Sequence, residues 1–230
     1  MKNAIAIITA RGGSKRIPKK NIKEFFGKPM LAYAIDACKK SGVFLEIMVS
    51  TDSDEIADVA RKFGANVPFM RSAATASDFA TTYDVLEEVI ARYRHEGRQF
   101  DVVCCVYPCV PFLRSYTLNR AFEALAGSDV DGVQPVCKYP APIEWAMNLE
   151  NGYLMPNDRK ALSIRSQDLV PKYYDVGMFY FVKTQTMLAQ RTVVPERTIG
   201  IVMDEGETQD IDTIDDWEIA ERKFEFWEAK

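Results

Sequence analysis

The chain of 230 residues has the length of one large domain or, less readily, of two small ones. Its 29 Lys and Arg against 33 Asp and Glu give a net charge of −4, which argues against a protein that binds nucleic acid or a membrane surface. The 47% of hydrophobic and 27% of charged residues are typical of a folded globular protein, and the single histidine, His95, excludes a zinc site built from several histidines.

The first part of the chain alternates between strand-like and helix-like patterns. Residues 4–9 form a continuous apolar run, which is typical of a strand buried on both faces. Apolar residues at positions i, i+3, i+4 and i+7 then predict a helix over 31–38. Residues 45–51 predict a second strand, and the helical spacing recurs over 56–63, where Gly64 predicts the helix end.

The alternation continues through the middle of the chain. The same spacings predict a helix over 86–93, a buried strand over 102–107, a helix over 118–125 and a strand over 131–139. Because a β-α-β-α order requires a parallel sheet with helices on both faces, the predicted fold class is α/β. Ligands in such folds bind beyond the carboxyl ends of the strands, so a site is expected in the loops that follow strands.

The pattern changes after about residue 139. Residues 140–172 contain four prolines, alternating polar and apolar residues, and an Asn151-Gly152 pair that signals a hairpin. We interpret 140–172 as a β arm that leaves the core and packs on a partner subunit, although a long surface loop would have the same composition. The core resumes with strands over 175–182 and 198–203 and ends in a helix over 214–228. The whole chain, 1–230, is therefore predicted to be a single domain with an arm.

The cysteines and the apolar segments indicate the cellular compartment of the protein. Five cysteines form an odd number without zinc-site spacing, and four of them lie in apolar, strand-like segments, which favours a reducing compartment. The apolar residues 4–10 are followed at once by Arg11 and further basic residues, which a signal-peptide cleavage region would not contain. The nearly uncharged stretch 102–113 is too short to cross a bilayer. We expect a cytoplasmic protein with no membrane partner.

A basic loop follows the first predicted strand. Residues 11–28 contain seven basic side chains against one acid, and the segment 10–21, here called the basic loop, reads Ala-Arg-Gly-Gly-Ser-Lys-Arg-Ile-Pro-Lys-Lys-Asn. Gly12 and Gly13 let backbone amides approach a ligand, Ser14 adds a donor, and the cations neutralise several phosphates. The order of a Walker A loop and of a dinucleotide G-x-G-x-x-G loop is absent. A solvated basic turn is the alternative, but the placement after the first strand favours phosphate binding.

An acidic segment near the C-terminus has the opposite charge. Residues 204–218 contain eight acids and no base, and within them lies Gln-Asp-Ile-Asp-Thr, residues 209–213. In an extended segment Asp210 and Asp212 point to the same side, so both can address one Mg²⁺, which prefers oxygen ligands. Alternatively, Asp212 and Thr213 cap the final helix. The two charged segments together predict a site for an Mg²⁺-bound nucleoside triphosphate.

Three motifs resemble one enzyme family. The basic loop, Val-Ser-Thr-Asp at 49–52 and the 209–213 motif are similar to the cytidylyltransferases that activate acidic sugars as CMP-sugars. The similarity runs from Ile5 to about Trp217. Within the family, Arg-Ser-Gln-Asp-Leu at 165–169 and Tyr-Asp-Val-Gly-Met-Phe-Tyr at 174–180 resemble the pseudaminic acid enzymes most, with the sialic acid and legionaminic acid enzymes as alternatives.

The resemblance implies a fold and a reaction. It implies a Rossmann-like nucleotidyltransferase fold, with a mixed, mostly parallel sheet covered by helices on both faces and a small β dimerisation arm. The substrates are CTP and an acidic nine-carbon sugar, whose anomeric hydroxyl attacks the α-phosphorus and releases pyrophosphate. Asp210 and Asp212 would bind Mg²⁺, and one of them, or a water bound to the metal, would help to deprotonate the hydroxyl.

The resemblance also assigns residues to the nucleotide. These are Arg11, Gly12, Gly13, Ser14, Lys15, Lys20, Asn21, Arg71, Thr82 and Tyr107. Arg11 and Lys20, with the two aspartates, are expected to be catalytic. Arg71 as a surface residue and Thr82 as a helix N-terminal residue are equally good interpretations of those two positions. Asp52 is interpreted as the cap of the second helix.

The arm is implied to act across a homodimer. Arg165 and Gln167 would bind the sugar in the partner's active site, and a planar guanidinium suits the sugar carboxylate. Three positions depart from the family pattern. Thr9 stands where proline is common, Tyr107 stands where sialic acid enzymes have a glutamine able to read cytosine, and Cys109, given no catalytic role, replaces a hydroxyl residue. Two alternatives therefore stay open: a glycosyltransferase that uses a nucleotide-sugar, and a nucleotide-binding module without activity.

Overall fold

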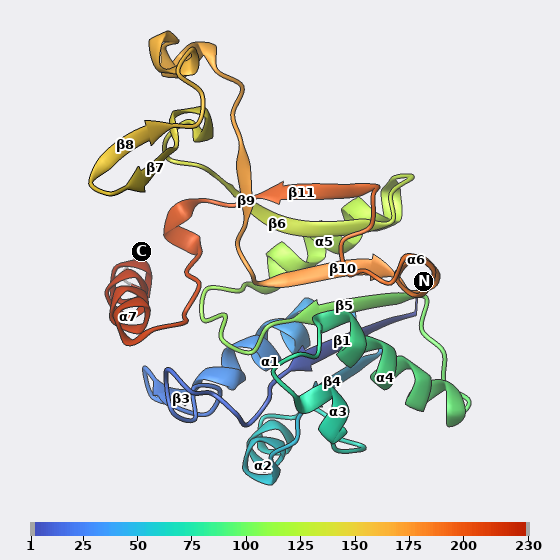
Figure 1. Cartoon of the computed structure of the whole chain (residues 1–230). Helices are drawn as coiled ribbons and strands as arrows, with labels where there is room; N and C mark the ends of the chain where they lie inside the picture. Colours follow the sequence, from blue (N-terminus) through green and yellow to red (C-terminus); the bar gives the residue numbers. More distant parts are fainter. Residues whose placement is uncertain (1–2, 229–230) are drawn as a thin grey trace.

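A central sheet forms the core of the computed structural model, which describes residues 3–228 (Figure 1). The strand order is β11-β6-β10-β5-β1-β4, and β9 pairs with the carboxyl end of β6. The strands are β1 (Ala4–Thr9), β4 (Glu46–Ser50), β5 (Val102–Val106), β6 (Gly132–Lys138), β9 (Tyr173–Asp175), β10 (Phe179–Lys183) and β11 (Thr198–Val202). Within this sheet β9 and β10 run antiparallel to the other five strands, which are parallel to one another, so the predicted mixed, mostly parallel sheet is confirmed.

Helices cover both faces of the sheet, as the sequence predicts. They are α1 (Met30–Ser41), α2 (Asp54–Lys62), α3 (Ala73–Ala76), α4 (Thr82–His95), α5 (Ser115–Gly127), α6 (Thr184–Gln190) and α7 (Ile214–Glu228). Alternate side chains of β1 point to opposite faces of the sheet and pack in two separate cores. Ala6 and Ile8 belong to the core that α1, α2, α5 and α7 complete, whereas Ile5 and Ile7 pack with α4 and α6. The continuous apolar run of β1 is the direct result of this two-sided burial.

The helix starts confirm one capping prediction and correct another. The final helix begins with a capping box, in which Thr213 Oγ1 accepts the Asp216 N–H and Asp216 accepts the Thr213 N–H. The interpretation of Asp52 as the cap of α2 is wrong. Ser53 is the N-cap, because its hydroxyl accepts the Ile56 N–H, and Asp52 is left to bond elsewhere. The sequence patterns also missed α3, α6 and a short hairpin of β2 (Glu24–Phe25) and β3 (Lys28–Pro29).

The predicted strand over 175–182 is two strands. β9 ends at Asp175, and β10 begins at Phe179; both pair antiparallel with β6, β9 along its residues 136–138 and β10 along its residues 132–133. The break lies at Gly177, whose φ of 63° is a left-handed conformation that glycine adopts without strain. Asp175 Oδ1 accepts the Gly177 N–H at 2.8 Å and closes the turn.

The arm leaves the sheet after β6 and returns through β9 (Figure 1). It contains η1 (Ile143–Trp145), β7 (Met147–Glu150), β8 (Tyr153–Pro156), η2 (Ala161–Ser163) and η3 (Ser166–Asp168). Asn151 and Gly152 have φ of 51° and 84°, as the hairpin signal requires. Its hairpin exposes large apolar side chains, since Leu149 is 70% and Tyr153 74% exposed. Such a surface is typical of a face that another molecule covers.

An ion-pair network around the buried Asp131 links the amino-terminal ends of β6 and β11 to the carboxyl end of β10. Asp131, 8% exposed, accepts from Arg197 Nε at 2.8 Å and lies 3.4 Å from Lys183 Nζ. The hydrogen bond from Arg197 lowers the pKa of Asp131. Its stabilising contribution is therefore present at neutral pH and is lost as the pH falls through the lowered pKa.

We expect Asp131→Asn to lower the Tm at pH 7 by a few degrees, with the loss shrinking as the pH falls below the ordinary carboxyl range. Thermal unfolding followed by circular dichroism measures it. Asp129→Asn is the control, because Asp129 pairs with the same Arg197 at 2.8 Å but is largely exposed. Equal losses in the two variants, or a loss independent of pH, would contradict the assignment.

Candidate functional site

The basic loop lies at the carboxyl edge of the parallel strands β1, β4 and β5. Two neighbouring cavities open there and share Thr9 and Arg11. The first, here called the basic cavity, has about 360 Å³ and is lined by Thr9, Arg11, Ser14, Lys15, Arg16, Ile17, Lys20, Asn21, Pro108 and Asp212. The second, the side cavity, has about 240 Å³ and is lined by Thr9, Arg11, Arg71, Thr75, Ser77, Asp78, Ala80, Thr81, Thr82, Val85 and Tyr107. Most residues assigned to the nucleotide therefore line one of two adjoining spaces.

The start of the basic loop is held by the loop after β4. Asp52 Oδ1 accepts the Gly12 N–H at 2.8 Å, which is the role that the capping interpretation missed. A Cβ at Gly12 would lie 3.1 Å from Ser53 Cβ, so only glycine fits this close approach without displacing its neighbour. The Ser14 N–H bonds to the Gly12 carbonyl at 3.0 Å and tightens the turn.

The basic loop and the acidic segment meet. Lys20 Nζ donates to the carbonyl of Ile211 at 2.5 Å and lies 3.3 Å from Asp212 Oδ1, and Arg16 Nη2 lies 2.8 Å from Asp212 Oδ2. Segments about 190 residues apart in sequence thus form one site. The sequence predicted this meeting from their opposite charges.

Asp210 carries the second carboxylate of the predicted metal pair. Loss of water around it raises the pKa of Asp210, and the negative charge of Asp212 raises it further. Two carboxylates close enough to repel are what a divalent cation relieves, so this donor set fits Mg²⁺. In the described part of the chain, no group of three or more His, Cys, Asp or Glu is arranged to hold a metal. A cation here would therefore take its other oxygens from ligand or water.

Asn21 supports the loop from inside. It is 4% exposed; its Nδ2 donates to the carbonyl of Arg11 at 2.8 Å, and its Oδ1 accepts from the Cys109 thiol at 3.3 Å. Both ends of the amide are thus used within the protein. Asn21 lines the basic cavity, but its bonds are those of a residue that fixes Arg11.

Cys109 gives a prediction about thiol chemistry. Burial raises the pKa of Cys109 to about 12, so its reactive thiolate is rare at neutral pH. We expect iodoacetamide at pH 7.5 to leave this thiol largely unmodified, as mass spectrometry of the digested protein would show. Cys109→Ser should keep turnover within about threefold, since a hydroxyl can also donate to Asn21. Rapid alkylation of Cys109 in the folded protein would contradict the prediction.

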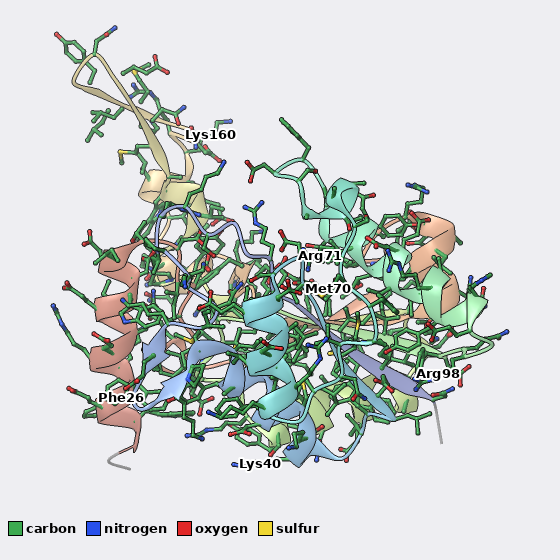
Figure 2. The ribbon with its side chains drawn as sticks, turned by 90° about the horizontal axis from the view of Figure 1, so that it is seen from below. Phe26, Lys40, Met70, Arg71, Arg98 and Lys160 are labelled. Atoms are coloured by element: carbon green, nitrogen blue, oxygen red, sulfur yellow. The ribbon has the colours of Figure 1, made fainter. Side chains whose placement is uncertain are left out.

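The side cavity contains the other residues assigned to the nucleotide. Arg71 is 8% exposed, so the interpretation as a surface residue is wrong (Figure 2). Its Nε and Nη2 donate to the hydroxyl and carbonyl of Ser50 at 3.0 and 2.7 Å, and burial lowers its pKa. Thr82 is the first residue of α4, and its hydroxyl lies 3.2 Å from Tyr107 Oη. A buried cation and two hydroxyls thus line one small space.

A second tyrosine fixes the ring of Tyr107, which the sequence did not indicate. The rings of Tyr107 and Tyr180 lie edge to face at 5.6 Å. The Tyr180 hydroxyl donates to Asp175 Oδ2 at 2.6 Å. Burial raises the pKa of both tyrosines, so both hydroxyls stay protonated at neutral pH.

Asp78 is a second residue that the sequence analysis missed. Its two oxygens lie 2.6 Å from Arg11 Nη1 and from Lys15 Nζ. The hydrogen bonds from Lys15 and Arg11 lower the pKa of Asp78. Both expected phosphate ligands are therefore bound to one carboxylate in this structure.

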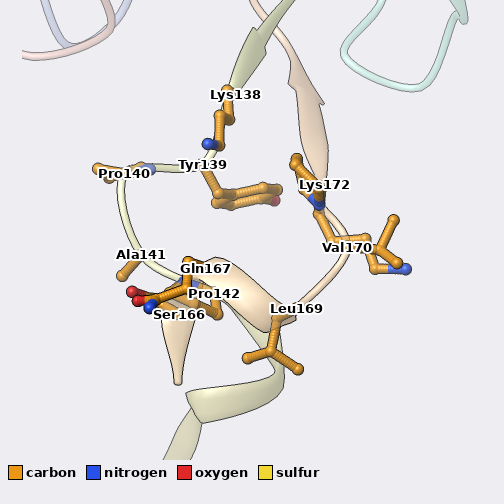
Figure 3. A pocket seen from close by; sticks show the side chains of 11 residues that line it. Lys138, Tyr139, Pro140, Ala141, Pro142, Ser166, Gln167, Leu169, Val170 and Lys172 are labelled. Atoms are coloured by element: carbon orange, nitrogen blue, oxygen red, sulfur yellow. The ribbon is translucent and has the colours of Figure 1, made fainter. Parts of the chain in front are cut away.

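Arg165 and Gln167 lie elsewhere. Gln167 lines a cavity of about 410 Å³ at the base of the arm. Lys138 and Tyr139, where the chain leaves β6, line the same cavity (Figure 3). Arg165 is exposed and pairs with Asp168 at 2.7 Å. Neither lines the basic cavity or the side cavity. Within one chain the structure does not bring these two residues to the nucleotide residues.

Comparison with known proteins identifies the family and the fold of the chain. The cytidylyltransferase family profile matches residues 5–211. The chain is 37% identical over 221 residues to the pseudaminic acid cytidylyltransferase of Campylobacter jejuni. The aligned region covers 96% of this chain and 95% of the relative. It is 31% identical over 226 residues to the CMP-N,N'-diacetyllegionaminic acid synthase of Legionella pneumophila, with 96% of each chain covered. A solved CMP:2-keto-3-deoxy-manno-octonic acid synthetase complexed with CTP has the same fold, with a TM-score of 0.69, 17% identity and coverage of 96% of this chain and 97% of that one.

Proposed function

Because the chain belongs to the cytidylyltransferase family, we propose that it transfers CMP from CTP to the anomeric hydroxyl of an acidic nonulosonic sugar, with pseudaminic acid as the substrate. The products are a CMP-sugar and pyrophosphate. The observation that supports this proposal is the meeting of Lys20 with Asp212, because it brings the basic loop, a candidate for phosphate binding, next to the acidic segment. N-acetylneuraminic and legionaminic acids are the alternative substrates.

The chain's own residues divide the work of binding CTP. Arg11, Lys15 and Lys20 bind the triphosphate in the basic cavity, and the amides of Gly12, Gly13 and Ser14 approach it. The base enters the side cavity, between Arg71, Thr82 and Tyr107. Asn21 acts through Arg11, whose carbonyl it holds.

Asp210 and Asp212 would hold Mg²⁺. When bound, this ion supplies positive charge that stabilises the attacked phosphate and the departing pyrophosphate. When CTP binds, Lys20 leaves Asp212 and contacts phosphate oxygens instead. Its positive charge then neutralises part of the negative charge that develops on the phosphates. The sugar hydroxyl forms its bond to the α-phosphorus as the bond to the β-phosphate oxygen breaks, and its proton goes to one of the two carboxylates.

A homodimer completes the sugar site in this proposal. Arg165 and Gln167 lie on an arm that extends away from the sheet (Figure 1), and the arm exposes Leu149, Tyr153 and Leu154. Packing this arm on a second copy would cover the apolar surface and bring Arg165 to the partner's nucleotide. The five free cysteines fit a cytoplasmic enzyme. Within residues 3–228, no helix combines the length and apolar character needed to cross a membrane.

The test is release of pyrophosphate from CTP in the presence of Mg²⁺ and one of four acids: pseudaminic, legionaminic, N-acetylneuraminic or 3-deoxy-octulosonic acid. We expect turnover with pseudaminic acid and little with the others, because the pocket shape reads stereochemistry. Turnover with a different acid would correct the substrate alone. Binding of CTP without turnover of any acid would favour the inactive module, and release of a nucleoside diphosphate from a nucleotide-sugar would favour a glycosyltransferase.

A further inference from the structure

Asp78 bridges the two cations that the proposed function gives to the triphosphate. Asp78 Oδ1 accepts from Arg11 Nη1 and Asp78 Oδ2 accepts from Lys15 Nζ, both at 2.6 Å. Arg11 lines both cavities, and Lys15 lines the basic cavity. A carboxylate with one oxygen on each of two cations resembles a phosphate in charge sign and in hydrogen bonding. Phosphate oxygens and Asp78 therefore compete for the same donors.

The segment that carries Asp78 is tied down at its ends. On one side, Ser77 Oγ donates to the carbonyl of Ala74 at 2.9 Å. On the other, Thr81 and Asp84 form the capping box of α4. Between these anchors Phe79 is 94% exposed and adds almost nothing to the core. The middle of the segment can thus move while both helices stay in place.

The ion pairs of Asp78 are of the kind that a ligand replaces at low cost. The side chains of Arg11, Lys15 and Asp78 are 41%, 77% and 49% exposed, so solvent screens their attraction. A triphosphate offers several charges to the same cations. Displacement of Asp78 then breaks two weak ion pairs, and Arg11 and Lys15 form stronger ion pairs with the phosphates in their place.

We propose that Asp78 is an intramolecular competitor of the triphosphate: it holds Arg11 and Lys15 in the free enzyme, leaves them when a polyphosphate binds, and returns as pyrophosphate departs. This inference rests on the proposed function, since that function places phosphates on Arg11 and Lys15. Asp78 weakens binding of CTP and of pyrophosphate alike, and so favours release of the product. A ligand without phosphate does not compete with Asp78 for Arg11 and Lys15.

The variant Asp78→Asn tests the proposal by calorimetry at fixed ionic strength, with tripolyphosphate, CTP and cytidine as probes. We expect tripolyphosphate and CTP to bind about fivefold tighter than to the wild type, as removal of two exposed ion pairs implies, and cytidine, which meets Asp78 only as a residue of the side cavity, to change less than either. Pyrophosphate should inhibit the variant at about fivefold lower concentration. Unchanged or weaker tripolyphosphate binding would overturn the proposal.

Glu55→Gln is the matched control. Glu55 pairs with Lys19 of the same basic loop at 2.8 Å and is 55% exposed, but it lines neither cavity. The substitution removes the same charge, so a tightening equal to that of Asp78→Asn would show a general electrostatic effect and overturn the specific role. A wild type that binds tripolyphosphate but not CTP would overturn the proposed function and leave the Asp78 comparison valid.

Phe79→Trp reports the motion itself. Because Phe79 is almost fully exposed, a tryptophan there fits without repacking the core. We expect tripolyphosphate to change its fluorescence, relative to the wild type with its own tryptophans, and cytidine to leave it unchanged. No change at saturating tripolyphosphate would show that the segment stays in place, and would overturn displacement.

Discussion

Asp210→Asn is expected to lower CMP transfer by on the order of 100-fold, while CTP still binds in the absence of Mg²⁺. The carboxylate of Asp210 is destabilised by loss of water and by the charge of Asp212, so it gains most from a divalent cation. Steady-state rates over a range of Mg²⁺ concentrations measure the effect. We expect the half-saturating Mg²⁺ concentration to rise, and Mn²⁺ binding followed by electron paramagnetic resonance to weaken in parallel.

Asp210 is a cleaner target than Asp212. Asp212 forms ion pairs with Arg16 and Lys20, so its removal changes the basic loop as well as the proposed metal site. Asp215→Asn is the control, because it removes the same charge from the same acidic segment at the first turn of α7. An Asp210→Asn enzyme with wild-type turnover and Mg²⁺ dependence would exclude Asp210 from the metal site.

Arg165→Ala is expected to abolish most sugar turnover but to recover activity when it is mixed with inactive Lys20→Met protein. In a mixed dimer of the proposed kind, the site of the Arg165→Ala subunit would keep its own Lys20 and would receive Arg165 from the other subunit's arm. Random exchange makes half of the dimers mixed with one intact site in two, so about a quarter of the wild-type activity should return. The pyrophosphate assay before and after subunit exchange measures it.

The arm offers its own control for this experiment. Arg159 lies on the same arm, between β8 and η2, and its replacement by Ala removes an arginine without touching the proposed sugar contact. Arg159→Ala should keep its kcat/KM, and Arg165→Ala should still bind CTP as the wild type does. If the mixture stays inactive although light scattering shows dimers, Arg165 does not act across the interface.

The sequence predicted the central elements well because local pattern and tertiary burial agree there. The apolar run of β1 and the helical spacing of α4 each report a face that packs on the sheet. The Asn151-Gly152 turn was predictable because its left-handed conformation restricts the residue types. The break at Gly177 was not, since residues 175–182 read as one strand and both β9 and β10 pair with β6, so that only the left-handed turn at Gly177 separates them.

The candidate site shows the same division. Opposite charge indicated that the basic loop and the acidic segment belong together, and Lys20 and Asp212 do meet. The partners of Asp52 and Asp78 were not predictable, because each bonds to a residue 40 or more positions away along the chain. For Asp52 the local signal of a helix cap even pointed to the wrong partner.

The arm is an insertion whose two ends meet. Lys138, the last residue of β6, pairs with Tyr173, the first residue of β9, and the Tyr139 N–H bonds to the Lys172 carbonyl at 2.9 Å. The chain therefore leaves and re-enters the sheet at almost one point. A change within the arm therefore reaches the sheet at two adjacent positions, away from the strands β1, β4 and β5. If the arm selects the sugar and the loops after β1, β4 and β5 bind CTP, as proposed, then this architecture separates the two tasks, and a change in the arm would alter the choice of sugar without altering the binding of CTP.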